Sequence, residues 1–135
     1  MDIAPLVVAL GGRVIGIDQQ TGNELWRNEM HGGGLSWVAI AVTDEYVFSS
    51  ASASKIFCIN RQTGESPWAA KTTGLGRATI LCTDERVFIS KSGFLDCFNK
   101  TNGEHLWVQD LRGAGKGGAA LGVSNNVVQA DGKSK

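Results

Sequence analysis

One phrase of eleven residues occurs three times in the chain, and this repetition limits the folds that the sequence can adopt. The copies cover residues 16–26, 58–68 and 97–107, and each has Asp or Asn at its third position, Gly at its seventh and Trp at its eleventh. The tryptophans Trp26, Trp68 and Trp107 follow one another at intervals of 42 and 39 residues. A period of about 40 residues with four short β segments is typical of β-propeller blades.

Each copy predicts a tight turn between two strands. A short polar side chain ends the first strand and can hydrogen-bond the turn; these residues are Asp18, Asn60 and Asn99. Glycine stands where the turn needs a positive φ, at Gly22, Gly64 and Gly103. The tryptophan lies in the next strand, where it can fill the wedge between blades while its indole N–H finds a partner. We therefore expect all three tryptophans to be buried docking residues.

These residues resemble the tryptophan-docking repeat of quinoprotein β-propellers, the pyrroloquinoline-quinone type, whose motif reads roughly Ala-x-Asp-x-x-Thr-Gly-x-x-x-Trp. Small residues stand where that family favours Ala, at Gly16, Cys58 and Cys97. The resemblance covers nearly the whole chain and implies a propeller fold. It leaves the function open, because the family includes quinone-dependent dehydrogenases and non-catalytic scaffolds, among them an outer-membrane assembly lipoprotein.

The strand pattern predicts one all-β domain over residues 1–135. It divides into a partial blade at 6–28, blades at 36–70 and 77–110, and strands of a further blade at 118–130. Inner strands are expected at 37–42, 77–82 and 118–123, and the first blade has none. Three blades are too few for a closed ring, since propellers have about 4–8.

We therefore expect half of a six-bladed propeller, completed by a homodimer that exchanges terminal strands. Whether residues 127–130 pair with 118–123, or are displaced by residues 6–10 of the other chain, stays open. The alternative is that the chain is a fragment of a longer propeller protein.

Composition argues against several partners. The formal net charge is zero, which gives no bulk attraction to nucleic acid or to a membrane. The sequence around residues 1–10 lacks the features of a secretion signal, so we expect a cytoplasmic protein. The three cysteines form no Cys-x-x-Cys pair, and Cys58 and Cys97 hold equivalent repeat positions. We expect them to be buried free thiols, and we expect no metal site.

The sequence contains no catalytic motif, so we expect no catalytic residues. His31 and His105 occupy different blade positions and are interpreted as surface or structural residues. The resemblance implies that dehydrogenases of this family use an eight-bladed ring, adjacent cysteines and a calcium ion. The chain has no adjacent cysteines. Pyrroloquinoline quinone is therefore not expected as a cofactor, and a dehydrogenase-like enzyme is the alternative function.

Charge separates between the two sides of the predicted propeller. The turns within the docking phrases and after the inner strands are mainly acidic. The loops on the other side are mainly basic, with Lys55, Lys71, Arg77, Lys91, Arg112 and Lys116. The loops into the inner strands, at 31–34, 73–76 and 113–118, are rich in glycine and can leave N–H groups for an anion. Ordinary turns that need glycine to return to the inner strand are the competing interpretation.

A small anionic ligand or a protein segment is therefore expected at the basic, glycine-rich side. The candidate residues are His31, Ser36, Trp37, Arg77 and Lys116. Guanidinium groups suit carboxylates or phosphates, and an indole offers a stacking surface. The function predicted from the sequence is thus a non-catalytic propeller scaffold or binding module.

Overall fold

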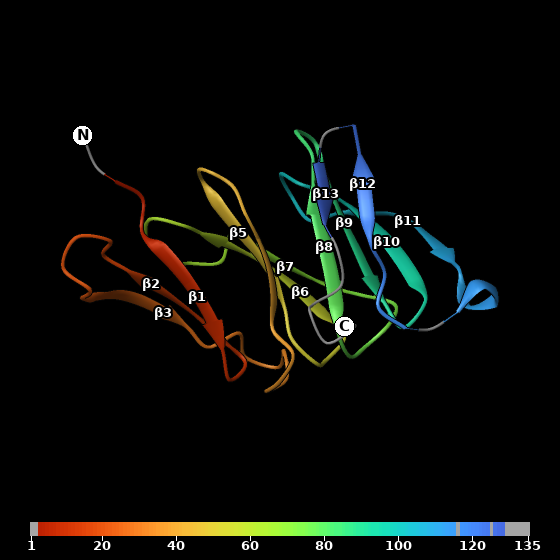
Figure 1. The fold of residues 1–135 in the computed structure, drawn as a ribbon, viewed down its shortest axis with the longest axis horizontal. Coiled ribbons are helices and arrows are strands. Elements are labelled where there is room, and N and C mark those ends of the chain that lie inside the picture. Colours follow the sequence, from red (N-terminus) through yellow and green to blue (C-terminus); the bar gives the residue numbers. More distant parts are fainter. Residues whose placement is uncertain (1–2, 116, 125, 129–135) are drawn as a thin grey trace.

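A computed structural model describes residues 3–115, 117–124 and 126–128, and the chain folds into short antiparallel strands (Figure 1). Blade 1 consists of β1 (Leu6–Leu10), β2 (Arg13–Ile17) and β3 (Glu24–Asn28). Blade 2 consists of β4 (Ala39–Val42), β5 (Tyr46–Ser50), β6 (Lys55–Asn60) and β7 (Trp68–Lys71). Blade 3 consists of β8 (Ala78–Cys82), β9 (Arg86–Lys91), β10 (Phe94–Asn99) and β11 (His105–Asp110). A short 3-10 helix, η1 (Arg112–Ala114), precedes a two-stranded sheet of β12 (Leu121–Val123) and β13 (Asn126–Val128).

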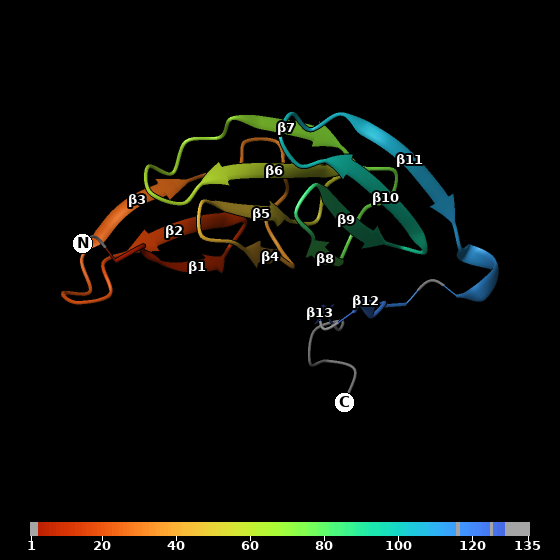
Figure 2. The ribbon, with the colours of Figure 1, turned by 90° about the horizontal axis from the view of Figure 1, so that it is seen from above.

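The three blades stand side by side in an arc (Figure 2). Strand order follows chain order in every sheet, so each blade is a meander. The strands β3, β7 and β11 lie along the outer edge of the arc, whereas β1, β4 and β8 lie along its inner edge. The β12–β13 hairpin lies inside the arc, and the Thr79 hydroxyl donates to the Ala119 carbonyl beside it at 2.9 Å. This arrangement confirms the predicted all-β propeller blades.

The inner strands begin later than the sequence predicts. The strand β4 begins at Ala39 instead of residue 37, β8 at Ala78 instead of 77, and β12 at Leu121 instead of 118. In blade 2 the reason is local, because Trp37 has a φ of 57° and cannot belong to an extended strand. Residues 129–130 and Lys116, both used in the sequence predictions, lie outside the described residues.

The three docking phrases form the predicted turn. In the second copy, the Asn60 side-chain oxygen accepts the N–H of Gln62 at 2.9 Å, and the Asn60 carbonyl accepts that of Gly64 at 2.8 Å. The other copies repeat this pattern. The turn glycines Gly22, Gly64 and Gly103 have φ values of 79°, 82° and 78°. Glycine adopts this conformation without the steric cost that a Cβ brings.

Two of the three tryptophans dock on the glycine turn of the following blade. A Cβ added to Gly64 would lie 2.6 Å from the Trp26 ring, and one on Gly103 would lie 2.4 Å from the Trp68 ring. The Trp26 indole N–H donates to the Arg61 carbonyl at 2.9 Å. The Trp68 indole N–H donates to the equivalent carbonyl in blade 3 at 3.0 Å. Both indoles thus have the partner that the sequence required.

Trp107 is exposed in the single chain, so within one chain the prediction that all three tryptophans are buried is wrong for this residue. Its relative exposure is 44%, compared with 8% for Trp26, and Trp68 is half-buried. Trp107 contacts Phe88 of its own blade, with ring centroids 6.0 Å apart. It is exposed because no described segment places a docking glycine against it.

The buried apolar residues form two clusters, and each lies between neighbouring blades. The cluster between blades 1 and 2 contains Val14, Trp26, Met30, Val47, Ala51, Phe57 and Ile59. The cluster between blades 2 and 3 contains Phe48, Ile56, Cys58, Ile80, Val87, Ile89 and Phe98. Because blades bury their apolar rows against each other, the blade junctions hold the fold together.

Replacing Trp26 by Ala should lower the free energy of unfolding by roughly 3–5 kcal/mol, because it empties a buried junction and leaves the Arg61 carbonyl without its donor. Urea unfolding followed by circular dichroism measures the change. Trp37→Ala is the matched control, because Trp37 is 52% exposed and its loss should cost much less. A larger loss for Trp37→Ala than for Trp26→Ala would contradict the docking role of Trp26.

Candidate binding face

The loops between blades are held against the hairpin turns of the neighbouring blades. The Gly33 carbonyl accepts the N–H of Ala53 at 2.9 Å, and the Ser52 carbonyl accepts that of Gly76 at 2.9 Å. The Ser92 hydroxyl donates to the Leu75 carbonyl at 2.6 Å. These bonds bring the interblade loops and the turns after β5 and β9 onto one side of the molecule. They form the candidate binding face.

The glycines of this face serve close packing. A Cβ on Gly34 would lie 2.3 Å from the Ser52 hydroxyl, and one on Gly74 would lie 2.3 Å from the Lys91 carbonyl. The N–H of Gly33 already donates to Met30, and that of Gly76 to Ser52. In the loops at 31–34 and 73–76, these contacts favour the competing interpretation, in which the chain needs glycine to return to the inner strand.

Trp37 and Arg77 lie together on this face. The Arg77 Cζ is 5.3 Å from the centroid of the Trp37 ring, within the range of a cation–π contact. By strand register the two residues are equivalent. Trp37 lies two positions before Ala39, which pairs with Ser50, and Arg77 lies two positions before the residue that pairs with Ser90, the equivalent of Ser50. Trp37 is 52% exposed and lies in the left-handed backbone region, which is uncommon for a bulky residue.

Each of these loops also has an exposed leucine two positions before Trp37 or Arg77 in the sequence. Leu35 and Leu75 also occupy equivalent positions, and they are 78% and 61% exposed. Large apolar side chains with this exposure, next to a guanidinium, are typical of a surface that contacts another molecule. We call Leu35, Trp37, Leu75 and Arg77 the Trp37–Arg77 surface.

The other predicted site residues are placed less closely. Ser36 is exposed and adjoins Trp37 in the chain. His31 is exposed in the same loop, and its carbonyl accepts the Lys55 ammonium at 3.4 Å. Lys116 lies outside the described residues. The structure thus joins Trp37 to Arg77, and it joins His31 to Lys55.

The positive charge of this face is smaller than the sequence indicates. Lys91, which we counted as a face residue, is buried with 1% exposure. Its ammonium donates to the Ser50 hydroxyl at 2.8 Å and to the carbonyls of Ala51 and Ala53 at 2.8 and 2.6 Å. Arg112 pairs with Asp110 at 2.8 Å. The face is therefore less suited to a bare polyanion than the charge count suggested.

Sequence reasoning also missed a buried carboxylate between blades 2 and 3. Asp96 is 1% exposed, and it accepts the Thr73 hydroxyl at 2.7 Å and the Thr73 N–H at 3.0 Å. The His105 Nε2 lies 2.7 Å from the same carboxylate. This contact supports the structural interpretation of His105.

The repeat alignment held a signal for both buried polar groups. Lys91 aligns with Leu10 and Ala51, and Asp96 aligns with Ile15 and Phe57. When a repeat position is apolar in two blades, the residue at that position in the third blade is predicted to be buried, even if it is charged. Counting charges loop by loop hides this signal.

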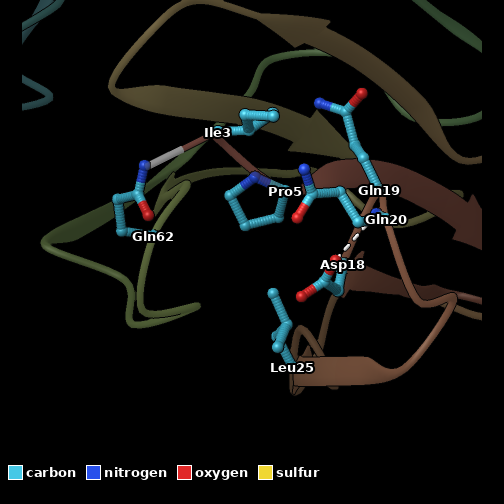
Figure 3. Close-up of a pocket in the computed structure, with 7 residues that line it drawn as sticks. All are labelled: Ile3, Pro5, Asp18, Gln19, Gln20, Leu25 and Gln62. Atoms are coloured by element: carbon cyan, nitrogen blue, oxygen red, sulfur yellow. Dashed lines mark hydrogen bonds between the residues drawn. The ribbon is translucent and has the colours of Figure 1, made fainter. Parts of the chain in front are cut away.

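A pocket of about 290 Å³ lies beside the first docking turn (Figure 3). Its lining residues are Ile3, Pro5, Asp18, Gln19, Gln20, Leu25 and Gln62. The Asp18 carboxylate accepts the N–H groups of its own turn, and the Gln19 amide donates to the Ala4 carbonyl at 2.7 Å. Its polar groups thus serve the local fold, and we assign it no ligand.

The cysteines are poor nucleophiles at neutral pH. Cys58 and Cys97 are buried, as predicted, and burial raises the pKa of the Cys58 thiol to about 12. Burial also raises the pKa of Cys82 and Cys97. Among the residues that the structure describes, no three His, Cys, Asp or Glu side chains form a group that could hold a metal ion.

No helix in the described part of the chain is long and apolar enough to cross a membrane.

The strand topology and the docking contacts show that the chain consists of β-propeller blades joined by docked tryptophans. A family model described as "Outer membrane protein assembly factor BamB" matches residues 10–135. The chain therefore belongs to the pyrroloquinoline-quinone-type β-propeller repeat family, and this confirms the resemblance drawn from its docking phrases.

Solved structures agree on the fold. BamB from Moraxella catarrhalis is 18% identical with a TM-score of 0.64, over 90% of this chain and 37% of that chain. The computationally designed Ika4 protein is 20% identical with a TM-score of 0.74, over 98% of this chain and 82% of that one. Quinohemoprotein alcohol dehydrogenase from Comamonas testosteroni is 15% identical with a TM-score of 0.56, over 80% and 21%.

The chain thus spans about a third of the Moraxella protein and about a fifth of the dehydrogenase. No curated protein sequence matches the chain.

The burial of Lys91 should make stability depend on pH. Burial lowers its pKa from 10.5 to about 8, so between these values the unfolded chain binds a proton that the folded chain has lost. The free energy of unfolding contributed by Lys91 should therefore rise with pH across this window, by an amount on the order of 2–3 kcal/mol. Below pH 8 both states are protonated and this gain is absent.

Urea unfolding of the wild type and of Lys91→Met at pH 7, 8, 9 and 10 measures the effect. The three cysteines, whose raised pKa lowers stability above pH 9, are the same in both proteins and cancel in the difference. The free energy of unfolding of the wild type should increase relative to that of the variant as pH rises. A difference that is independent of pH would contradict a buried, ionisable Lys91.

Proposed function

We propose that the protein is a non-catalytic propeller module that binds a protein segment on the Trp37–Arg77 surface. The observation that carries this proposal is the Arg77 guanidinium lying 5.3 Å from the exposed Trp37 ring, in loops that also expose Leu35 and Leu75. Such a surface fits a segment with apolar side chains and at least one carboxylate. Its apolar part would cover the leucines and the indole, and its carboxylate would bind Arg77.

The backbone conformation of Trp37 supports a functional surface. A bulky residue in the left-handed region costs on the order of 1–3 kcal/mol, and such costs concentrate at sites that bind ligands. The relatives give a second support, because the matching family model is described as an assembly factor, which is a protein that acts with other proteins.

A small planar anion is the second candidate ligand. The guanidinium and the indole of the same pair favour it, since one can bind a carboxylate or phosphate while the other stacks. The bonded glycine N–H groups and the burial of Lys91 weigh against it. We therefore rank the protein segment first.

The proposal also concerns how the propeller ring is completed. Three blades with an exposed junction at each end of the arc fit one half of a six-bladed homodimer, and a homodimer would present the Trp37–Arg77 surface twice. Blades of a longer polypeptide are the alternative way to complete the ring, since the solved relatives other than the designed protein are much longer than this chain.

Quinone-dependent catalysis is the alternative function, and two features of the described residues weigh against it. The resemblance implies a calcium ion and adjacent cysteines, whereas no metal-binding group is present among the described side chains. The cysteines lie far apart in sequence and have raised pKa values. We therefore propose no step that uses a quinone.

A displayed library of random twelve-residue peptides, selected on the immobilised protein, tests the proposal. Selected peptides should combine Asp or Glu with aromatic or aliphatic residues. Their dissociation constants should rise about 10- to 100-fold for Arg77→Ala, the loss expected for one charge-assisted hydrogen bond. Trp37→Ala should weaken them similarly, and fluorescence anisotropy measures both changes.

Arg86→Ala is the matched control, because Arg86 is half-exposed, begins β9 and pairs with Glu85 instead of Trp37. It should leave binding within about twofold. Peptides that bind equally well to Arg77→Ala would overturn the site. Benzenehexacarboxylate that binds in an Arg77-dependent way, with no peptide selected, would overturn the protein segment in favour of the planar anion.

A further inference from the structure

The two ends of the arc carry the two halves of the contact that joins the blades. Each internal junction places a tryptophan on a docking glycine, Trp26 on Gly64 and Trp68 on Gly103. The third tryptophan, Trp107, is 44% exposed on blade 3. The third docking glycine, Gly22 on blade 1, has the same positive φ, but a Cβ there would meet no atom within 4 Å.

The face of blade 1 that points away from blade 2 shows the same lack of cover. Leu6, Val8 and Leu10 alternate along β1, and they are 52%, 36% and 54% exposed. Their register equivalents are buried in both other blades; these are Val47, Ser49 and Ala51 in blade 2, and Val87, Ile89 and Lys91 in blade 3. The preceding blade covers those rows, and no described blade precedes blade 1.

We propose that a second copy of this chain supplies both missing partners. Trp107 docks on Gly22 of the partner subunit, and its indole N–H donates to the carbonyl of Gln19 of the partner subunit. Gln19 is chosen because it aligns with Arg61 and Lys100, whose carbonyls accept the other two indoles. The proposal rests on the half-ring included in the proposed function.

A second copy fits because one chain offers both halves of the contact. The exposed row of blade 3, with Trp107 and Phe88, matches the row that blade 2 presents to blade 3, with Trp68 and Phe48. Two such junctions are identical in a two-fold dimer, and two arcs of three blades give six blades, within the range of closed propellers.

The inner edge of blade 1 lacks a paired strand among the described strands, and a strand from the partner would supply it. The strands β5 and β9 each pair with an inner strand, whereas β1 pairs only with β2 among the described strands. In one chain β12 pairs with β13, with Leu121 opposite Val128. Val128 aligns with Val8, because Leu121 pairs with Val128 as Ile40 pairs with Ser49 and Ile80 with Ile89. In the dimer β1 of the partner therefore replaces β13 and sets the partner's Val8 opposite Leu121.

Sedimentation velocity from 1 to 100 μM tests the proposal on the full chain. The wild type should form a species of twice the 14.3 kDa chain mass. Trp107→Ala should raise the dimer dissociation constant at least about tenfold, while its circular dichroism spectrum stays that of the wild type, because Trp107 is exposed in the single chain. Val108→Ala is the control, because Val108 is 43% exposed on the same strand and points to the opposite face.

A mixing experiment identifies the head-to-tail geometry. Val8→Lys should also weaken the dimer, because it places a charge on the face that receives Trp107. An equimolar mixture of Trp107→Ala and Val8→Lys chains keeps one intact junction, so it should associate where each variant alone is monomeric. A dimer that uses one patch twice would gain nothing from mixing, and this outcome would overturn the proposal.

Three further results would overturn it: a monomeric wild type, an assembly larger than a dimer, or a Trp107→Ala dimer as tight as the wild type. A monomeric wild type would also favour further blades on a longer polypeptide as the partner of Trp107. Peptide binding measured with the monomeric Trp107→Ala variant separates the two proposals, because Trp37 and Arg77 belong to one chain. Loss of the dimer with retained binding leaves the proposed function standing.

Discussion

The contact between an indole and the bare backbone of a glycine turn determines how one blade meets the next. At the first junction, Gly64 has a φ of 82° and also leaves the space that the Trp26 ring fills. One residue thus satisfies the turn and the junction together. Arg61 adds to this contact, because its carbonyl accepts the indole while its guanidinium donates to the carbonyls of Pro5 and Thr43. Turn, blade spacing and interblade core are therefore set at one place.

The features that the sequence predicted correctly are local ones. Strand positions, the Asx hydrogen bonds and the positive φ values depend on a few adjacent residues, so the repeated phrase contains what determines them. The burial of Trp107 within one chain was predicted wrongly, because it depends on a following blade and not on the phrase itself. The start of β4 was predicted wrongly because Trp37 is β-favouring by residue type but has a φ of 57° in its loop.

Charge was the least reliable guide to the binding face. Lys91 and Asp96 are charged residue types at positions that the repeat reserves for the interior, and cross-blade acceptors or donors satisfy them there. Lys91 is buried at a junction, and Arg112 forms an ion pair with Asp110. The face is therefore better described as an apolar surface that carries the Arg77 guanidinium than as a positively charged one. The predicted pair Trp37 and Arg77 lies on this surface, and the close packing of Gly34 and Gly74 weighs against the predicted anion site in their loops.

The binding face and the fold use different positions of the same repeat. Trp37 and Arg77 are equivalent residues of successive blades, as are Leu35 and Leu75, and none of them belongs to a docking phrase. Their spacing is fixed by the junction below them, where Trp68 docks on Gly103. The repeat can therefore change the residue type at the face position of each blade without disturbing the contact that holds the blades. In such a design the docking phrase determines the architecture, and the residue before each inner strand determines what the face can bind.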